Sequence, residues 1–529
     1  MKITPRTESF AVSPQIQASD IAEIKARGFK TILCNRPDGE AHDQPEAEII
    51  RQAAEDAGLV FVHLPLSSPA VSAADAQKMA MILREMPAPI LAYCRSGTRS
   101  TALFNAAQTQ APPPKTTRKI YDIVIVGGGS AGISTAASLR KRDKSLSIAI
   151  IEPSDQHYYQ PGWTLVGAGI LPQSVTHKPM ARVIPTGVKW LKTAATSFSP
   201  DENRVMLANG DDISYRVLVL CPGLMLDWAA IPGLTETLGR NHVTSNYRFD
   251  LAPYTQKLTA GLNSGRALFT QPPMPIKCAG APQKAMYLSC DEWRRAGTLN
   301  AIEVEFHNAG AVLFGVPAYV PALMDYVERY GIHLKFESKL VGVDGPARIA
   351  RFEQKTADGQ SVVVEQSFDM LHVVPPQRAP DFIKNSPLAA ASGYVAVDEA
   401  SLQHPVYKNV FGLGDACSTP NAKTAAAVRQ QTPVVAGNIL AFLQNKPLPF
   451  AYYGYGSCPL TVARNKIVLA EFSYGGKITP TFPTWMLDGT RPTRSAWFLK
   501  ETILPRFYWH GMLKGREWLM QNHTQDNKK

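Results

Sequence analysis

The feature that most constrains this chain is the segment 121–142, YDIVIVGGGSAGISTAASLRKR, which predicts a buried strand, a glycine turn and a helix in direct succession. Gly127, Gly129 and Gly132 occupy the G-x-G-x-x-G positions: the first permits the tight turn, the second lets the backbone approach a pyrophosphate, and the third lets helix and strand pack closely. Glu152 ends the next predicted strand, twenty residues after Gly132, where an acid binds ribose hydroxyls. The segment therefore predicts a dinucleotide-binding unit.

A second motif decides which dinucleotide such a unit binds. KNVFGLGDA (408–416) places Asp415 at the end of an apolar strand, just before a predicted helix. This resembles the second flavin motif of the glutathione-reductase-like flavoproteins, in which the aspartate holds the ribityl chain and the helix N-terminus faces the flavin. We therefore expect FAD as the cofactor.

The chain predicts a second nucleotide-binding unit around residues 265–345, but one without a phosphate cradle. Its first strand, 265–270, runs into QPPMPIKCAGAP instead of another glycine triad. Two adjacent prolines remove N–H donors, so a second pyrophosphate would lack its partners. This disfavours NAD(P)H as the electron donor and leaves an NADH:quinone-type dehydrogenase as the weaker alternative.

Cysteine chemistry is the next question, because the chain has only 7 cysteines in 529 residues. We read neither a secretion signal nor a membrane span, which indicates a reducing compartment where thiols persist. Cys278 lies in this loop of Pro and Gly after the strand 265–270, and Cys417 follows Asp415 by two residues. If a helix begins at Asp415, its positive end favours the Cys417 thiolate. For both thiols the alternative is a small buried side chain. Core packing suits Cys221 and Cys290 better, and Cys458 is undecided.

Several longer runs resemble one family, the sulfide:quinone oxidoreductases, particularly the branch that includes the mitochondrial enzyme. The similarity covers nearly all of residues 119–520 and is carried by HYYQPGWTLVGAG (157–169), PIKCAGAPQK (275–284), MLHVVPPQ (370–377), KTAAAVRQQ (423–431) and GSCPL (456–460). The resemblance implies a glutathione-reductase-like α/β flavoprotein with two Rossmann-type units. It also implies an FAD site made by Gly127, Gly129, Ser130, Ala131, Gly132, Glu152, Gln160, Ala195, Asp415 and Lys423.

The same resemblance implies that Cys278 and Cys417 form the redox pair. One departure is that Ala416 stands directly after the aspartate, where the mitochondrial relatives are expected to have the cysteine. Sulfide would attack the pair and leave a persulfide, which a small thiol such as glutathione, sulfite or a protein cysteine then accepts. Electrons would pass through FAD to a membrane quinone. A flavin redox sensor without turnover is the second alternative.

The charge of the chain bears on its partners. The net charge of +11 is spread along the sequence, which contains no arginine-rich arm and no cysteine or histidine spacing typical of zinc sites. We therefore expect neither nucleic acid nor a metal ion as a ligand. A homo-oligomer stays open. Residues 490–529 carry eight Lys/Arg against three Asp/Glu among many aromatics. This composition predicts a membrane-associating tail in which Lys500, Arg506, Lys514 and Arg516 meet headgroups. The alternative is an ordinary helix packed on the flavoprotein. We expect a peripheral protein on the cytoplasmic or organelle-matrix face of a respiratory membrane.

A proline-rich linker, 108–119, divides residues 1–107 from the flavoprotein core at 120–489. In the first part, LAYCRSGTRST places Cys94 at a strand end and Arg99 in the following loop, where backbone N–H groups and the arginine favour a thiolate. The C-x-x-G-x-R spacing is that of rhodanese-type sulfur transferases, not tyrosine phosphatases. Residues 1–107 resemble small phosphatase-like sulfur-transferase domains, including NRPDGE (35–40), whose Asp38 is a candidate relic acid. Sulfur transfer, hydrolysis and an interaction module stay open.

Overall fold

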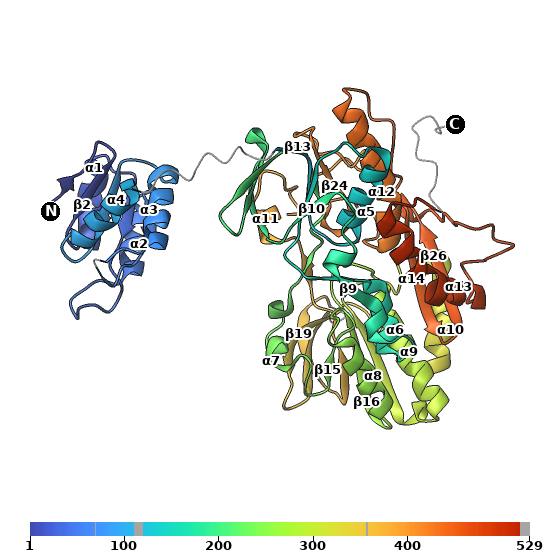
Figure 1. The fold of residues 1–529 in the computed structure, drawn as a ribbon. Helices are drawn as coiled ribbons and strands as arrows, with labels where there is room; N and C mark the ends of the chain where they lie inside the picture. The colour runs from blue at the N-terminus through green and yellow to red at the C-terminus, as the bar shows by residue number, and fades with distance from the viewer. Residues whose placement is uncertain (69, 110–119, 356–357, 519–529) are drawn as a thin grey trace. The chain divides into compact units, whose positions relative to one another are not determined.

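The computed structural model describes residues 1–529 except 69, 110–119, 356–357 and 519–529. The chain divides into two compact units, Met1–Thr117 and Arg118–Lys529 (Figure 1). The predicted linker at 108–119 falls almost entirely outside the described residues. The last helix before it, α4, runs to Thr109, two residues beyond the predicted domain boundary at 107. Within the described part of the chain, no helix combines the length and apolarity needed to cross a bilayer.

The smaller unit is a five-stranded sheet between two helical layers. Its strands lie in the order β1-β2-β5-β3-β4, parallel except for β1. Alternate residues of the central strands pack against α1 and α2 on one face and against α3 and α4 on the other. Because both faces of the sheet are covered, the sequences of these strands are continuous apolar runs. The elements are β1 (Thr4–Pro5), β2 (Phe10–Ser13), α1 (Ile21–Ala26), β3 (Thr31–Cys34), α2 (Ala47–Asp56), β4 (Val60–His63), α3 (Ala73–Glu85), β5 (Ile90–Tyr93) and α4 (Thr98–Thr109).

The larger unit contains the two predicted Rossmann-type units. The first is a seven-stranded sheet ordered β10-β7-β6-β13-β12-β11, with β24 also paired to β13. Helices α5 and α12 pack on one face of the parallel strands. The hairpin of β11 and β12, which continues the sheet beyond β13, packs its side chains against the other face. Its elements are β6 (Ile120–Val126), α5 (Ser130–Arg142), β7 (Ile148–Ile151), β10 (Val188–Leu191), β11 (Ala195–Ser199), β12 (Arg204–Leu207), β13 (Asp212–Leu220), β24 (Val410–Gly412) and α12 (Ala425–Leu443).

The second unit is an all-parallel sheet ordered β15-β22-β16-β17-β18. The antiparallel hairpin of β25 (Gly456–Ala463) and β26 (Lys466–Phe472) packs against its helix α9. Its elements are β15 (Val243–Thr244), α8 (Ala252–Gly261), β16 (Gly265–Gln271), α9 (Ala281–Ala296), β17 (Ile302–Asn308), α10 (Val320–Tyr330), β18 (His333–Lys335) and β22 (Met370–His372). The predicted α/β class with two Rossmann-type units is confirmed.

Short elements complete the larger unit. The helices among them are α6 (Trp163–Gly167), α7 (Leu234–Thr237) and α11 (Asp381–Lys384). The strands are β8 (Gln156–Tyr158), β9 (His177–Pro179), β14 (Met225–Leu226), β19 (Ser338–Asp344), β20 (Ile349–Lys355), β21 (Ser361–Ser367) and β23 (Gln377–Arg378).

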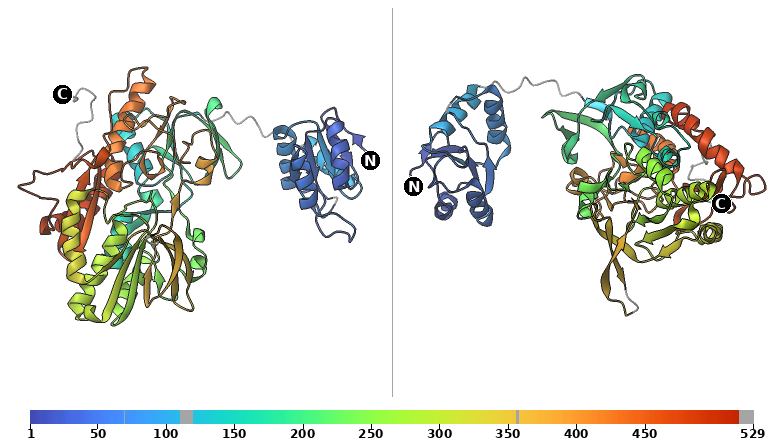
Figure 2. Two further views of the ribbon diagram at one scale, coloured as in Figure 1. Left: turned by 180° about the vertical axis from the view of Figure 1, so that it is seen from behind. Right: turned by 90° about the horizontal axis from the view of Figure 1, so that it is seen from below.

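The C-terminal segment packs on the flavoprotein with one side. It consists of α13 (Arg494–Phe498), a π-helical turn (Leu499–Ile503) and α14 (Leu504–His510), which lie on the outside of the larger unit (Figure 2). Tyr508 and Trp509 are buried in the same apolar cluster as α5. The part of the predicted tail at 519–529 lies outside the described residues.

Candidate functional site

A cavity of about 450 Å³ lies in the larger unit, where both Rossmann-type units and the C-terminal segment meet. Its walls include the predicted residues Gly127, Gly129, Ser130, Ala131, Glu152, Gln160, Cys278, Asp415 and Lys423. The volume falls within the usual range of ligand sites. The structure therefore brings most of the predicted FAD residues, and one predicted thiol, to a single cavity.

The glycine turn between β6 and α5 has the close contacts that its sequence predicts. Gly127 has a φ of +106°, and a Cβ there would lie 2.5 Å from the carbonyl oxygen of Cys221. A Cβ on Gly132 would lie 1.9 Å from the carbonyl oxygen of Gly127, which explains why helix and strand need glycine to pack. Gly129, in contrast, has no chain atom within 4 Å of a Cβ position and lines the cavity. The open side of the turn is the side that a pyrophosphate would occupy.

Glu152 is held at the cavity edge by two backbone donors. Its carboxylate accepts hydrogen bonds from the N–H of Gly128 at 2.7 Å and of Ser154 at 2.8 Å. Beside it, the Ser130 hydroxyl lies 2.7 Å from the hydroxyl of Tyr508. The C-terminal segment thus contacts the glycine turn directly.

The same cavity contains a half-buried acid, Asp415, with the half-buried Lys277 and the buried Lys423. Burial raises the pKa of Asp415 and lowers the pKa values of Lys277 and Lys423, and the opposite charges counter both effects. Lys277 Nζ donates to Gln160 Oε1 at 2.6 Å. Lys423 Nζ donates to the carbonyl oxygen of Cys417 at 2.7 Å.

These residues fit FAD. The turn at Gly129 leaves space beside the N-terminus of α5, where unpaired N–H groups suit phosphate oxygens. Glu152 is held by the N–H of Gly128 at the cavity edge, where an acid for the ribose was expected, and Asp415, the acid that the resemblance assigns to the ribityl chain, lines the same cavity. Gly132 contributes through packing and is not among the described residues that line the cavity. Ala195, expected beside the adenine, begins β11 as a buried core residue and is likewise not brought to the cavity walls.

Cys278 lies in the loop between β16 and α9, which replaces the second glycine turn. Its backbone is left-handed, with a φ of +48°, and its N–H donates to the carbonyl oxygen of Lys423 at 2.9 Å. Its Sγ accepts a hydrogen bond from Lys284 Nζ at 3.2 Å and lies 3.9 Å from Cys458 Sγ. The hydrogen bond from Cys458 and the two lysines Lys284 and Lys500 lower the pKa of Cys278, and the same contact with Cys278, with burial, raises that of Cys458.

The structure does not bring Cys417 to the cavity. The expectation of a helix starting at Asp415 is wrong: Gly414–Ala416 form a single 3-10 turn, and α12 begins only at Ala425. Cys417 is extended and fully buried in the apolar cluster on the far side of the first sheet from α5 and α12. Burial raises its pKa to about 12. The helix-dipole argument for this thiol therefore does not hold.

Lys500 is a site residue that sequence reasoning assigned elsewhere. Its side chain is 5% exposed and lines the cavity, so the expectation that it meets lipid headgroups is wrong. Burial and the nearby Lys284 charge lower its pKa to about 7. Lys500 lies among aromatic and apolar residues of the tail, and this sequence contains no pattern that predicts its inward orientation.

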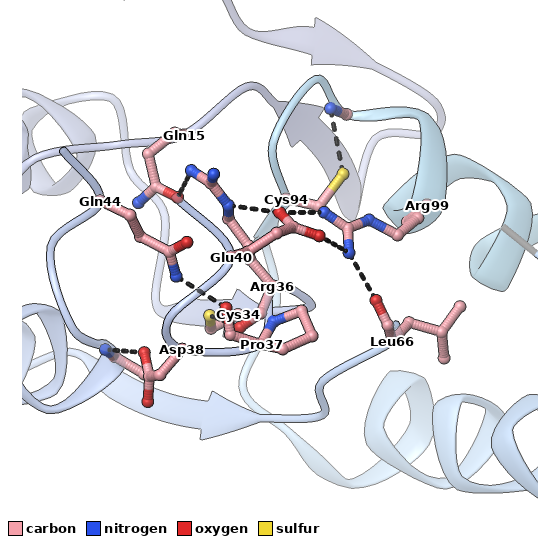
Figure 3. A network of polar contacts seen from close by, with 12 residues as sticks. Gln15, Cys34, Arg36, Pro37, Asp38, Glu40, Gln44, Leu66, Cys94 and Arg99 are labelled. Carbon is pink, nitrogen blue, oxygen red and sulfur yellow. Dashed lines mark hydrogen bonds and ion pairs between the residues drawn. The ribbon is translucent and has the colours of Figure 1, made fainter. Parts of the chain in front are cut away.

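The smaller unit has its own thiol site, at the loop between β5 and α4 (Figure 3). Cys94 is buried, and its Sγ accepts a hydrogen bond from the Gly97 N–H at 3.1 Å. Hydrogen bonds from the loop outweigh burial and lower the pKa of Cys94. Asp38, the candidate relic acid, accepts a hydrogen bond from the N–H of Ala47 at 2.7 Å, at the start of α2.

Arg99 is held by a carboxylate beside this loop. Glu40 lies between two arginines, 2.6 Å from Arg99 Nη1 and 2.7 Å from Arg36 Nε, as Figure 3 shows. The hydrogen bond from Arg99 is the main reason that the pKa of Glu40 falls to about 2. Arg99 Nη1 also donates to the carbonyl oxygen of Leu66 at 2.6 Å. Glu40 was not predicted from the sequence, although it ends the NRPDGE run. Among the described residues, no cluster of His, Cys, Asp and Glu could hold a metal ion.

Comparison with known proteins assigns both units. Residues 3–111 match the family described as beta-lactamase hydrolase-like protein, phosphatase-like domain, and residues 121–259 match pyridine nucleotide-disulphide oxidoreductase. A mitochondrial sulfide:quinone oxidoreductase of Dictyostelium discoideum is 42% identical over 408 residues, covering 77% of this chain and 88% of that protein. The one from Mus musculus is 38% identical over 400 residues, covering 76% and 88%. The crystal structure of the sulfide:quinone oxidoreductase from Aquifex aeolicus, at 20% identity, covers 75% of this chain and 92% of that one with a TM-score of 0.61, which supports the fold. The chain belongs to the sulfide:quinone oxidoreductase family.

Proposed function

We propose that this protein oxidises sulfide at Cys278 and passes the electrons through FAD to a quinone. The observation that carries the proposal is the placement of a thiol with a lowered pKa in the same cavity as the glycine turn. FAD, when bound, supplies the two-electron acceptor that thiol chemistry requires. The relatives from Dictyostelium discoideum and Mus musculus are sulfide:quinone oxidoreductases, which supports the same reaction class.

The residues around Cys278 have distinct tasks in this proposal. Lys284 stabilises the thiolate by a charge-assisted hydrogen bond, and Lys500 adds a second positive charge in a buried site where electrostatic effects are strong. The same cations favour anionic sulfur species in the cavity. Asp415 and Lys277 contribute polar groups to the lining of the same cavity.

The rival NADH:quinone dehydrogenase receives no support from the second sheet. After β16 the chain continues into Pro272 and Pro273, which donate no N–H. The test is anaerobic mixing of the FAD-loaded protein with sulfide or with NADH, followed by a short-chain quinone. We expect sulfide to bleach the flavin absorbance and the quinone to restore it. Bleaching by NADH with no response to sulfide would refute the proposal.

For the sulfur product, we propose a small thiol or sulfite as acceptor, with Cys94 as a further acceptor within the chain. The lowered pKa of Cys94 and the C-x-x-G-x-R loop support sulfur transfer at the smaller unit. The test supplies sulfide and quinone without an external acceptor, traps persulfides by alkylation and reads Cys94 by mass spectrometry. Persulfide on Cys94 in wild type but not in Cys278→Ser supports the transfer. Equal labelling in both proteins shows capture from solution and refutes it.

We also propose peripheral association with a quinone-containing membrane. Exposed apolar side chains gather near the C-terminal segment: Trp485 is 86% exposed and Phe498 57%. Exposed Arg506 and Lys514 provide positive charge in the same segment. Sedimentation with anionic liposomes should be weakened by Trp485→Ser with Phe498→Ser, while the flavin content stays unchanged. Unchanged sedimentation of this double variant would contradict the assignment of the surface.

A further inference from the structure

The carboxylate of Glu40 lies where an anionic ligand of the smaller unit would bind. Its two oxygens pair with Arg99 Nη1 at 2.6 Å and Nη2 at 2.7 Å, and one of them also accepts from Arg36 Nε at 2.7 Å (Figure 3). Both arginines are buried, at 8% and 5% exposure, and they come from different segments, the start of α4 and the chain just after β3. A two-oxygen contact between arginine and a carboxylate is among the strongest polar contacts in proteins. Glu40 therefore takes the side of Arg99 that would otherwise bind the oxygens of an anionic ligand.

The backbone N–H groups of the Cys94 loop are directed at the thiol. The Cys94 Sγ accepts a hydrogen bond from the Gly97 N–H at 3.1 Å. Burial alone would raise the pKa of Cys94, but backbone hydrogen bonds, led by those of Ser100 and Ser96, outweigh burial and lower it. A loop of this kind binds an oxyanion when its N–H groups point at the ligand oxygens. Here these groups stabilise the thiolate itself, so the loop keeps fewer donors for a bound oxyanion.

The four charged groups joined by these contacts balance one another. Arg36 and Arg99 carry two positive charges. The Glu40 carboxylate and the Cys94 thiolate carry two negative charges, and the hydrogen bond from Arg99 holds the pKa of Glu40 at about 2, so its charge persists at neutral pH. The hydrogen bond and charge of Glu40, together with the charge of Cys94, raise the pKa of Arg99, so this guanidinium interacts with both anions.

Burial makes the charge of an incoming sulfur donor important. Cys94 is fully buried, so a donor must lose water before it meets the sulfur. Removing water from an ion is costly, and the cost is repaid only where the site supplies opposite charge. The Glu40 side chain is 26% exposed, so an approaching anion meets a negative charge at the edge of the site. A site without net positive charge therefore disfavours a dianion much more than a donor of low charge.

We propose that Glu40 makes the smaller unit selective for persulfide donors and excludes tetrahedral dianions such as thiosulfate and phosphate monoesters. The inference rests on the proposed transfer of sulfur to Cys94. In that transfer, the Cys94 thiolate attacks the outer sulfur of a persulfide. A new S–S bond forms at Cys94, the S–S bond of the donor breaks, and the donor leaves as a thiolate. No electrons are gained or lost overall, so the step needs no further oxidant or reductant.

A purely structural role is the alternative for Glu40, since its contacts also fix the segment after β3 to the start of α4. The two roles predict different results for Glu40→Gln, which keeps the side-chain size and removes the charge. Loss of a structural link impairs all donors alike, whereas loss of the charge admits dianions. Glu23→Gln is the matched control, because it removes the same charge from an exposed pair with Arg27 at the end of α1.

The first experiment measures anion binding with sulfate, an unreactive tetrahedral dianion. The reduced, FAD-loaded, full-length protein is alkylated with iodoacetamide in sulfate or in sodium chloride of equal ionic strength, and the Cys94 peptide is quantified by mass spectrometry. We expect saturating sulfate to slow alkylation of Glu40→Gln by about tenfold and to leave wild type and Glu23→Gln unchanged. Protection of wild-type Cys94 by sulfate, or its absence in Glu40→Gln, would overturn the inference. This readout needs no sulfur transfer, so it is independent of the proposed function.

The second experiment compares two sulfur donors without sulfide or quinone. Persulfide on Cys94 is followed by mass spectrometry after addition of glutathione persulfide or of thiosulfate. Wild type should load faster from the persulfide, and Glu40→Gln should lower the ratio of the two rates by about tenfold or more. An equal ratio in both proteins would show that Glu40 is only structural and would overturn the inference. Wild type that loads from neither donor would refute the proposed transfer to Cys94, and the sulfate result would still decide whether Glu40 excludes dianions.

Discussion

Lys284 is predicted to control the protonation of Cys278, and its replacement tests this directly. The lysine is 2% exposed, and its Nζ donates to the Cys278 sulfur at 3.2 Å. A hydrogen bond to a charged group contributes about 1.5–3 kcal/mol. Since one pKa unit corresponds to about 1.4 kcal/mol, Lys284→Met should raise the pKa of Cys278 by roughly one to two units.

The assay is the pH dependence of alkylation of Cys278 in the reduced protein, read by peptide mass spectrometry. Lys500→Met is the matched control, because Lys500 lowers the pKa of Cys278 through its charge and has no hydrogen bond to this sulfur among the described residues. Its midpoint should rise by less than that of Lys284→Met. An unchanged midpoint in Lys284→Met, or a larger shift in Lys500→Met, would refute the assignment of Lys284 as the stronger of the two lysines that stabilise the thiolate.

Three further predictions concern other parts of the chain. Gly129→Ala should fold normally but bind FAD more weakly, because its Cβ points into the open space of the cavity. Gly132→Ala should instead lower the melting temperature, because its Cβ would lie 1.9 Å from the carbonyl oxygen of Gly127. Measurements of flavin content and of thermal unfolding separate the two effects. Lys500→Met should stabilise the fold by roughly 1–3 kcal/mol at pH 6, because a buried charge with few partners is removed. The folded lysine loses its proton near pH 7, whereas the unfolded lysine keeps its proton up to about pH 10.5. Between these values the free-energy cost of burying Lys500 falls as the pH rises, so the gain from Lys500→Met should shrink. An equal gain at pH 6 and pH 9.5 would contradict this prediction. Glu40→Gln should loosen Arg99 and slow sulfur transfer to Cys94 by about tenfold, and an unchanged rate with a sulfane-sulfur donor would show that the ion pair is only structural.

The parts of the site that can be predicted from sequence are those fixed by local geometry. The glycine turn and Glu152 belong to one continuous run of strand β6, turn, helix α5 and strand β7, so their spacing determines their placement. Asp415 likewise lies three residues after the end of β24. The FAD end of the cavity therefore follows from the order and spacing of residues along the chain.

The thiol chemistry is harder to predict, because it depends on contacts between distant segments. Cys278 and Cys458 meet only through the packing of β25 on α9. For Cys417, the sequence does contain a pattern that argues against a helix. The residue before a proline is disfavoured in a helix, so Pro420 makes a helix that begins at Asp415 improbable. The aromatic tail predicted a surface segment, but one face of it packs on α5 and places Lys500 in the cavity.

The most direct test of the central claim, that sulfide is oxidised at Cys278, is an anaerobic sulfide titration of FAD-loaded wild type and Cys278→Ser. Both proteins are followed by flavin absorbance in the presence of a small thiol acceptor. We predict stoichiometric bleaching of the wild-type flavin and none in Cys278→Ser, although the variant keeps its flavin. Bleaching of Cys278→Ser at the wild-type rate would contradict the account.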